Sequence, residues 1–302
     1  MEPRDKQKIG SIRTFIERLE KLNLDEPSND VFYFRGHTDH EKYKLQPTIY
    51  REPAFIENEH RMFREIIMRC PNDFSSSLTT FEKLVKMQHY KLPTRLLDLT
   101  ENPLIALLFA VKGKHDKDKD KDGEVLIFKV PKKEIKYYDS DTVSILSNLA
   151  KLKGNFNIKR IKKASNEKFN EDNNIRYLLH EIKEDKPYFE PKIKAEDLEL
   201  VVCVKPKLDN PRIIRQDGAF FLFGINDYKK YPASIPDEYK ITNGSYSLII
   251  NKAGKEKIYK QLSTIGINDV TMFPEIDYVS DYLKDKFKNE FNNYFKIRNN
   301  DF

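Results

Sequence analysis

The sequence has 302 residues, of which 39% are hydrophobic and 34% are charged, so it can bury a core beneath a heavily charged surface. Its formal charge of +6 permits an RNA or DNA partner but is weaker than the one-sided charge of a dedicated nucleic-acid domain. Two cysteines, Cys70 and Cys203, exclude a disulfide scaffold, and no apolar run is long enough to span a bilayer. We therefore expect a cytoplasmic protein with no membrane partner.

The first third of the chain predicts helices around one strand. Apolar residues at helical spacing predict a helix over residues 8–23, and "VFYFRG" predicts a strand over 31–36 that ends at Gly36. Further helices are expected at 54–69, 79–90 and 103–112. Between the last two, Pro93 keeps Leu92 out of the helical region, so "KLPTRLLD" (91–98) is expected to be a connector.

Strands dominate the expectations for the rest of the chain. The charged, low-complexity run at 112–123 predicts a solvated loop, and residues 132–195 predict a mainly helical insertion. Strands are expected at 124–130, 198–205, 219–225 and 246–251, followed by helices at 254–264 and 276–296. Without a regular alternation of strand and helix, this order predicts an α+β fold with a mixed or antiparallel central sheet and flanking helices.

The first candidate site is Arg35 with Gly36. An arginine at the end of an apolar strand should place its guanidinium at the rim of the sheet, where it can hold a phosphate or carboxylate with two parallel hydrogen bonds. Gly36 has no Cβ to block a ligand. The alternative is that Arg35 pairs with a structural carboxylate.

The second candidate is the polar start of "MQHYKLPTRLLDLTENPLIALLFA" (87–110). Asn102 followed by Pro103 predicts the start of the next helix, with Asn102 as its cap, and Asp98, Thr100 and Glu101 can serve the same end. That explanation does not cover four residues that we expect to form the wall of a pocket facing Arg35: Gln88, His89, Tyr90 and Arg95. The alternatives are a packing role for His89 and a buried pair between Arg95 and Asp98.

Two later segments add candidates. In "NPRIIRQDGAFFLFG" (210–224), Arg212 and Arg215 flank Gln216 ahead of an aromatic strand, which indicates either a ligand-facing edge or an ordinary turn. In "MFPEIDY" (272–278), Glu275 is the best-placed late carboxylate, although its default role is to start a helix. His37 and His40 lack further metal ligands nearby, so no metal site is expected.

These stretches, in this order, resemble the FRG domain family, named for the triplet that stands here as Phe34-Arg35-Gly36. The runs "QHYKLPTRLLDLTENPLIALLFA", "PRIIRQDGAFF" and "FPEIDYVSDYL" resemble its later motifs. The resemblance extends over about 30–285 and is least over 132–195, which implies one FRG-type domain over residues 1–302. Where the family often has Trp after the Asp, this chain has Leu99.

The FRG triplet is also similar to the aromatic-Arg-Gly of Arg-type ADP-ribosyltransferases. This resemblance implies an ADP-ribosyltransferase-like sheet on which Arg35 and Gly36 bind NAD, with Tyr90, Arg95 and Gln216 also on the cofactor. It implies catalysis by Glu275, which would stabilise the positive charge on the ribose, and by His89. Neither the Ser-Thr-Ser strand nor the late Glu-x-Glu of those enzymes is evident, so Glu181 and Glu184 stay open as the carboxylate.

The sequence thus supports an NAD-dependent ADP-ribosyltransferase that modifies a macromolecule such as RNA or DNA. It would act as a bacterial toxin or antiphage effector, with an antitoxin or regulatory protein as a further partner. The alternative is a non-catalytic module that binds nucleic acid or a phosphate ligand through Arg35, Arg95, Arg212 and Arg215. A nuclease is disfavoured because no tight metal-binding cluster is visible.

Overall fold

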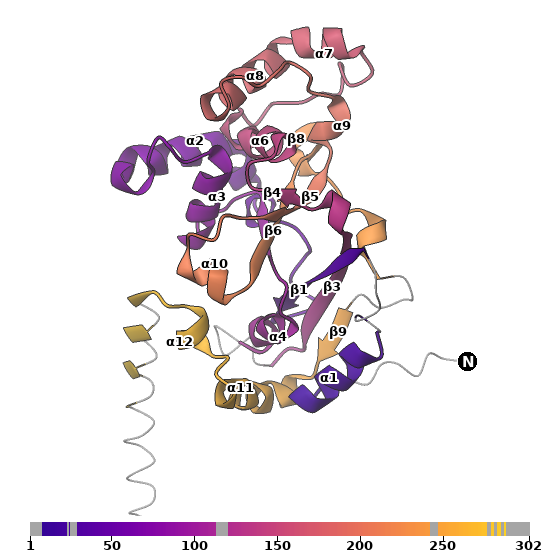
Figure 1. The fold of residues 1–302 in the computed structure, drawn as a ribbon, viewed down its shortest axis with the longest axis vertical. Helices are drawn as coiled ribbons and strands as arrows, with labels where there is room; N and C mark the ends of the chain where they lie inside the picture. Colours follow the sequence, from indigo (N-terminus) through magenta and orange to yellow (C-terminus); the bar gives the residue numbers. More distant parts are fainter. Residues whose placement is uncertain are drawn as a thin grey trace, which may run out of the picture.

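A computed structural model describes residues 8–22, 24, 29–112, 120–241, 247–276 and five later residues: 279, 280, 283, 284 and 287. The chain builds a seven-stranded sheet in the order β4-β5-β6-β2-β1-β3-β9, in which only β4 and β5 are parallel (Figure 1). The strands are β1 Asp30–His37, β2 Leu96–Thr100, β3 Gly123–Pro131, β4 Lys136–Tyr137, β5 Val201–Lys205, β6 Gly218–Phe223 and β9 Ser247–Ile250. The mixed sheet confirms the predicted α+β class.

Helices surround this sheet, and the expected helical stretches fall close to their predicted ranges. They are α1 Ile12–Glu20, α2 Pro53–Arg69, α3 Thr80–His89, α4 Pro103–Val111, α6 Asp141–Asn148, α7 Asn166–Glu171, α8 Asn173–Asp185, α9 Ala195–Leu198, α10 Pro211–Arg215, α11 Lys255–Thr264 and α12 Asp269–Met272. A separate hairpin joins β7 Ile225–Asn226 to β8 Tyr228–Pro232. Among the described residues, none of the helices combines the length and apolar character that a bilayer crossing requires.

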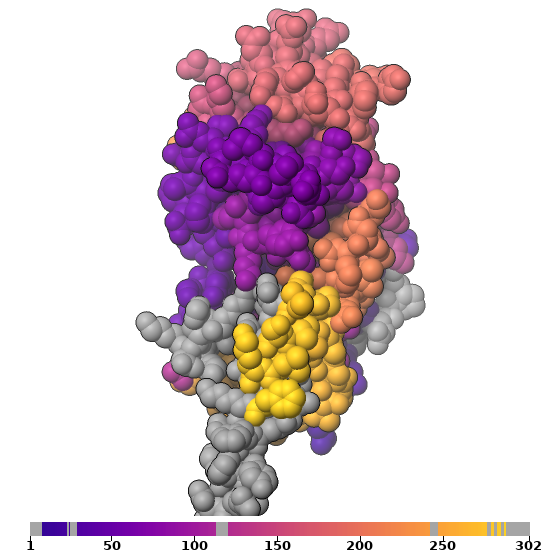
Figure 2. All heavy atoms as spheres, turned by 90° about the vertical axis from the view of Figure 1, so that its left-hand side faces the viewer, coloured from indigo at the N-terminus to yellow at the C-terminus, as the bar shows by residue number. Residues whose placement is uncertain are grey.

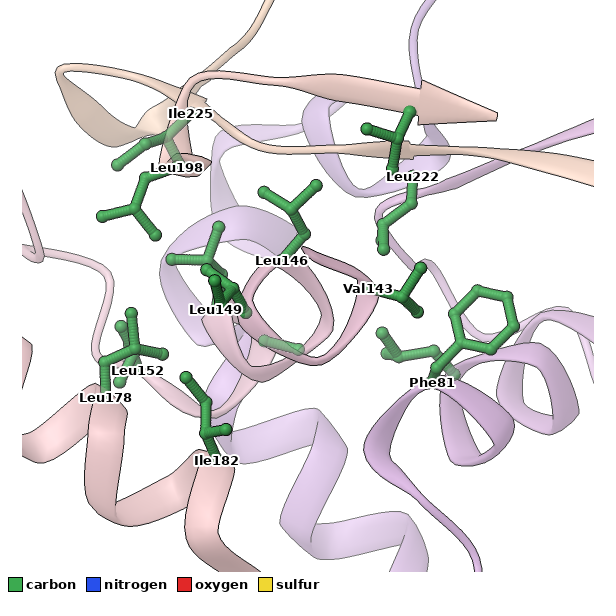
Figure 3. Close-up of a cluster of buried hydrophobic side chains, with 14 of the residues drawn as sticks. Phe81, Val143, Leu146, Leu149, Leu152, Leu178, Ile182, Leu198, Leu222 and Ile225 are labelled. Atoms are coloured by element: carbon green, nitrogen blue, oxygen red, sulfur yellow. The ribbon is translucent and has the colours of Figure 1, made fainter. Parts of the chain in front are cut away.

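Successive side chains along each strand point to opposite faces of the sheet and so pack into different hydrophobic cores. On one face, here called the helix face, α3, α6 and α8 cover β2, β5 and β6, while α1, α4 and α11 cover β1, β3 and β9. Figure 3 shows Leu146 and Leu149 between Leu222 of the sheet and Ile182 of α8. On the other face, here called the loop face, Tyr33 and its neighbours pack mainly against irregular segments.

The main error of the sequence prediction lies at the centre of the sheet. The expected connector 91–98 contains the start of β2, which makes five residue pairs with β6. Leu97 and Leu99 are buried on the loop face while Asp98 points to the helix face, so the pattern has the two-residue period of a strand. Pro93 ends the preceding helical region, but the extended chain that follows it becomes a strand.

The surroundings of two glycines differ from two other expectations, the role of Gly36 and the extent of the strand 219–225. At Gly36, an added Cβ would lie 2.0 Å from the carbonyl oxygen of Ala106, so the glycine lets α4 lie against β1 rather than admitting a ligand. At Gly224, a Cβ would lie 2.2 Å from the carbonyl oxygen of Leu198, and the predicted strand 219–225 is interrupted there. Most of the predicted helix 276–296 and of the predicted loop 112–123 lies outside the described residues.

Candidate functional site

The candidate site begins at a split between β1 and β2. These neighbouring strands share a single residue pair, Phe34 with Thr100. Beyond this pair, in the direction of Leu96, side chains bond the backbone carbonyl groups of β2 in place of a neighbouring strand. Arg35 Nη1 donates to the carbonyl oxygen of Asp98 at 2.7 Å, and Gln88 Nε2 donates to the carbonyl oxygen of Leu96 at 3.4 Å. Arg35 therefore lies inside the sheet and not at its rim, because β1 is flanked by β2 and β3.

Arg35 is held by a chain of polar groups that continues to β9. Its Nε donates to Nε2 of His37 at 2.9 Å. Because a guanidinium can only donate, this bond makes Nε2 the acceptor and leaves the proton of a neutral His37 on Nδ1. Nδ1 lies 2.9 Å from Glu124, and Ser247 Oγ lies 2.9 Å from the other carboxylate oxygen of Glu124. Burial, with a further contribution from the charge of Arg35, lowers the pKa of His37.

Asp98 presents its carboxylate beside this guanidinium. The Oδ2 atom accepts a hydrogen bond from Gln88 Nε2 at 3.0 Å and lies 3.8 Å from Arg35 Nη1. The hydroxyl of Thr94 donates to the amide oxygen of Gln88, which fixes the orientation of that amide. The Asp98 side chain is 60% exposed, whereas that of Arg35 is 15% exposed. A fixed carboxylate is thus open to solvent next to a largely enclosed cation.

A cleft of about 390 Å³ opens over Asp98 on the helix face. This volume is within the range of small-molecule sites, roughly 300–1,000 Å³. Residues of α3, β2, α10 and β6 line it, among them Gln88, His89, Asp98, Arg212, Gln216 and Phe220. Figure 2 shows α10 (orange) and the described C-terminal residues (yellow) side by side, below the purple surface of α2 and α3.

The segment after α11 brings Glu275 to the edge of this cleft. Glu275 Oε1 lies 3.3 Å from His89 Nε2 and 3.8 Å from Arg212 Nη1. Gln216 Nε2 donates to the carbonyl oxygen of Met272 at 2.8 Å, and the Arg212 guanidinium lies 4.7 Å from the ring centre of Phe273. Burial and the charge of Arg212 lower the pKa of His89, and Glu275 opposes them, so His89 is mainly neutral at pH 7.

The structure therefore gathers several sequence-predicted residues and leaves others outside. His89 and Gln216 line the cleft, Glu275 contacts His89, and Arg35 lies behind Asp98. Tyr90 packs edge-on against His89 but borders a neighbouring hollow, and Gly36 lies under α4. Glu181 is on α8, where it pairs with Arg64, and neither it nor Glu184 lines the cleft.

Arg95 is the residue whose environment differs most from the expectation. Its side chain has no exposed surface, and its partner is Glu59 of α2 rather than Asp98, with N–O distances of 3.0 and 2.6 Å. Arg95 Nη1 also donates to the carbonyl oxygen of Phe223 at 3.0 Å. Arg95 thus has no surface for contact with a ligand. Arg215, another arginine of the alternative binding module, donates to the carbonyl oxygen of Thr271.

Asp98 is the site residue that the sequence interpretation missed. Its position before a helix suggested that it could share the capping role. The structure confirms Asn102 as the cap of α4, since its side chain accepts from the backbone N–H of Leu104, whereas Asp98 lies within β2. The alternation Leu97-Asp98-Leu99 was the available signal, because a strand that buries both leucines on one face must turn the aspartate to the other.

The His37 contacts predict a pH dependence of folding. Since the folded-state pKa of His37 is below its ordinary value of about 6.5, the unfolded chain binds the proton more readily as the pH falls below that value. Stability should therefore be full above about pH 6.5 and decrease towards the folded-state pKa. Urea denaturation between pH 7.5 and 5 should show a smaller decrease for His37→Gln than for the wild type. Equal decreases would contradict a neutral His37 in the native state.

Comparison with known proteins supports the resemblance to the FRG domain. The sequence model of the FRG domain matches residues 30–119, a range that includes Arg35, Gln88, His89 and Asp98 but not Arg212, Gln216 or Glu275. Searches of curated proteins and of solved structures found no match. Within the described part of the chain, no three His, Cys, Asp or Glu side chains are grouped so as to hold a metal ion.

Proposed function

Since this chain contains an FRG domain at residues 30–119, we propose that its cleft binds NAD and transfers ADP-ribose to a macromolecule, with nucleic acid as the acceptor. The observation that carries the proposal is the pair of groups at the split of the sheet. An exposed carboxylate, Asp98, lines a cleft that also holds a mainly neutral histidine, and a cation, Arg35, lies 3.8 Å behind this carboxylate.

The groups around the cleft suit the charges of NAD. A guanidinium has five N–H donors, and within the described part of the chain the hydrogen bonds of Arg35 to His37 and Asp98 use two of them. The remaining donors can hold a phosphate oxygen or a ribose hydroxyl. The amide of Gln216 adds a group that can bond the nicotinamide carboxamide. These features support binding of the nicotinamide riboside end of NAD over β2.

The proposed transfer needs one carboxylate and one base. The bond between ribose C1′ and the nicotinamide nitrogen breaks, and its electron pair leaves with nicotinamide. Positive charge then develops on the ribose, and the fixed carboxylate of Asp98 offsets it without reorganisation. An acceptor nucleophile bonds to C1′, and its proton passes to His89, whose depressed pKa favours the neutral base. Glu275, 3.3 Å from His89, orients the imidazole and stabilises it once protonated.

The first test is NAD binding by Arg35 variants. Arg35→Lys should weaken binding by about 10- to 100-fold, because a hydrogen bond to a charged group contributes about 1.5–3 kcal/mol and lysine lacks the forked donors. Titration calorimetry on folded protein measures the change, with Arg69→Lys on the exposed end of α2 as the control. If folded wild-type protein binds no NAD, the proposed function fails.

The second test identifies the acceptor. NAD labelled in its adenylate part should leave label on RNA or DNA after incubation with a cell lysate, and nuclease treatment should remove it. Label that resists nuclease and is removed by protease would overturn the nucleic-acid acceptor.

An enzyme that consumes NAD or attaches ADP-ribose to nucleic acid would suit a bacterial toxin or antiphage effector, and an antitoxin or regulatory protein would then hold it in check. Induced expression should then arrest bacterial growth, and Asp98→Asn should restore it.

A further inference from the structure

A second hollow, of about 730 Å³, lies outside the cleft. It is formed by the first half of α2, by the loop that follows the short helix η4 (Leu149–Lys151), and by the β7–β8 hairpin. The lining residues are Glu57, Asn58, His60, Arg61, Lys153, Gly154, Asn155, Asn157, Tyr228 and Lys230. None of them lines the cleft, so the hollow is a separate surface.

This hollow is positively charged. Arg61, Lys153 and Lys230 line it and are all exposed, while Glu57 is the acidic residue among the lining side chains. Burial is the largest cause of the lowered pKa of His60, and the charges of the surrounding cations Lys229, Arg64, Arg61 and Lys153 add to it. A concave surface lined by cations favours the binding of an extended anion.

Two tyrosines accompany these cations: Tyr228 lines the hollow, and Tyr231, which is not among the lining residues, lies beside it next to Lys230. The rings of Tyr228 and Tyr231 meet edge to face, with centres 6.0 Å apart, and Tyr231 is 50% exposed. Lys230 Nζ lies 5.9 and 5.1 Å from the two ring centres, and Lys159 Nζ lies 5.6 Å from that of Tyr228. Aromatic faces interleaved with lysines suit a polymer that carries both flat bases and phosphates.

The hollow is held in shape from beneath. Lys229, between Tyr228 and Lys230, is fully buried, and its Nζ donates to the carbonyl oxygen of Leu152 at 2.5 Å and pairs with Glu59 at 2.9 Å. These bonds tie the hairpin both to the loop and to α2. Gly154 allows the loop to approach α2 closely, since an added Cβ would lie 2.8 Å from the carbonyl oxygen of Glu57. The tyrosines and lysines are therefore presented by a fixed support.

We propose that this hollow binds single-stranded nucleic acid, with Arg61, Lys153 and Lys230 on phosphates and the exposed ring of Tyr231, at the side of the hollow, stacked on a base. A duplex keeps its bases stacked inside, where an exposed tyrosine cannot reach them, whereas an unpaired strand offers its base faces. An acidic peptide could meet the cations but would leave the ring of Tyr231 unused. The inference deepens the proposed function by placing its nucleic-acid partner, and its test contains no NAD.

Fluorescence anisotropy of the full chain with a short labelled single-stranded RNA tests the proposal. Three phosphate contacts predict that log K decreases with log salt concentration with a slope of about −2. The double variant Lys153→Glu, Lys230→Glu should weaken binding at least about tenfold and reduce the slope. The matched control reverses two exposed lysines elsewhere, Lys132→Glu and Lys133→Glu on the short helix η3 (Lys132–Glu134), and should bind nearly as the wild type does.

Stacking is tested separately at Tyr231. Tyr231→Ala should weaken RNA binding about tenfold, whereas Tyr231→Phe keeps the ring and should bind like the wild type. A duplex of the same sequence and a polyglutamate of similar charge should both bind more weakly than the single strand. No binding by wild-type protein, equal binding of the duplex or polyglutamate, or charge reversals no more harmful than the control would each overturn the proposal. Binding without NAD turnover would leave this inference standing and remove the proposed function.

Discussion

Glu59→Ala should lower the free energy of unfolding by about 3–5 kcal/mol, because it leaves two buried cations without their counter-charge. Arg95 and Lys229 are both fully buried, and both pair with the Glu59 carboxylate, at 2.6 and 2.9 Å. The group joins three parts of the chain that are distant in sequence: α2, the residue just before β2, and β8. Urea denaturation followed by circular dichroism measures the change.

Glu57→Ala is the control for this variant. Glu57 lies on the same helix, two residues away and exposed, so its loss should change stability by no more than about 0.5 kcal/mol. Lys229 itself has its pKa lowered to about 8, chiefly by burial. If Glu59→Ala were as stable as Glu57→Ala, the two cations would have to be neutral or solvated in the native protein, and the buried cluster would be misassigned.

Asp98→Asn should slow the release of nicotinamide by about 10²–10³-fold while leaving the protein folded. Asparagine keeps the shape of the side chain and an oxygen that can accept from Gln88 Nε2, so the network around Arg35 should persist. What it removes is the negative charge that we propose to lie beside the ribose. Single-turnover release of nicotinamide from labelled NAD measures the effect, and Asp209→Asn, an exposed aspartate outside the cleft lining, provides the control.

Glu275→Gln in the same assay distinguishes the two carboxylates. If Glu275 orients His89, its replacement should reduce the rate less than Asp98→Asn and shift the pH profile of the reaction, because the imidazole loses its charged neighbour. A larger loss for Glu275→Gln than for Asp98→Asn would exchange the two roles and make the late glutamate the group that stabilises the ribose.

Local patterns predicted the elements that depend on local interactions. The helices α2, α3 and α4 follow from apolar residues at helical spacing, and the structure adds the local devices that start them, Pro53 and Pro103 in the first turn and the capping pair Thr79 and Glu82. The strand β2 was missed because its neighbours β6 and β1 are distant in sequence, and the nearby proline and helix cap gave a sufficient local explanation.

The sequence could name several residues of the candidate site, but it could not predict how they contact one another. The sequence singled out Arg35, His89, Gln216 and Glu275, but the contact between His89 and Glu275 depends on how the chain returns after α11. Arg95 was misread for the same reason, because Glu59 and Phe223, which hold it in the core, are 36 and 128 residues away. A charged residue in an apolar run could face either a pocket or a buried partner, and only tertiary structure distinguishes them.

The open edge of β2 also bears on the solubility of the protein. A strand whose backbone carbonyl groups lack a neighbouring strand can template pairing with another chain, which leads to aggregation or strand exchange. Arg35 and Gln88 occupy the carbonyl oxygens of Asp98 and Leu96, and the guanidinium adds a charge that an incoming strand would have to desolvate. By occupying these carbonyl groups, the arginine of the FRG triplet should hinder pairing of a foreign strand with the middle of the sheet.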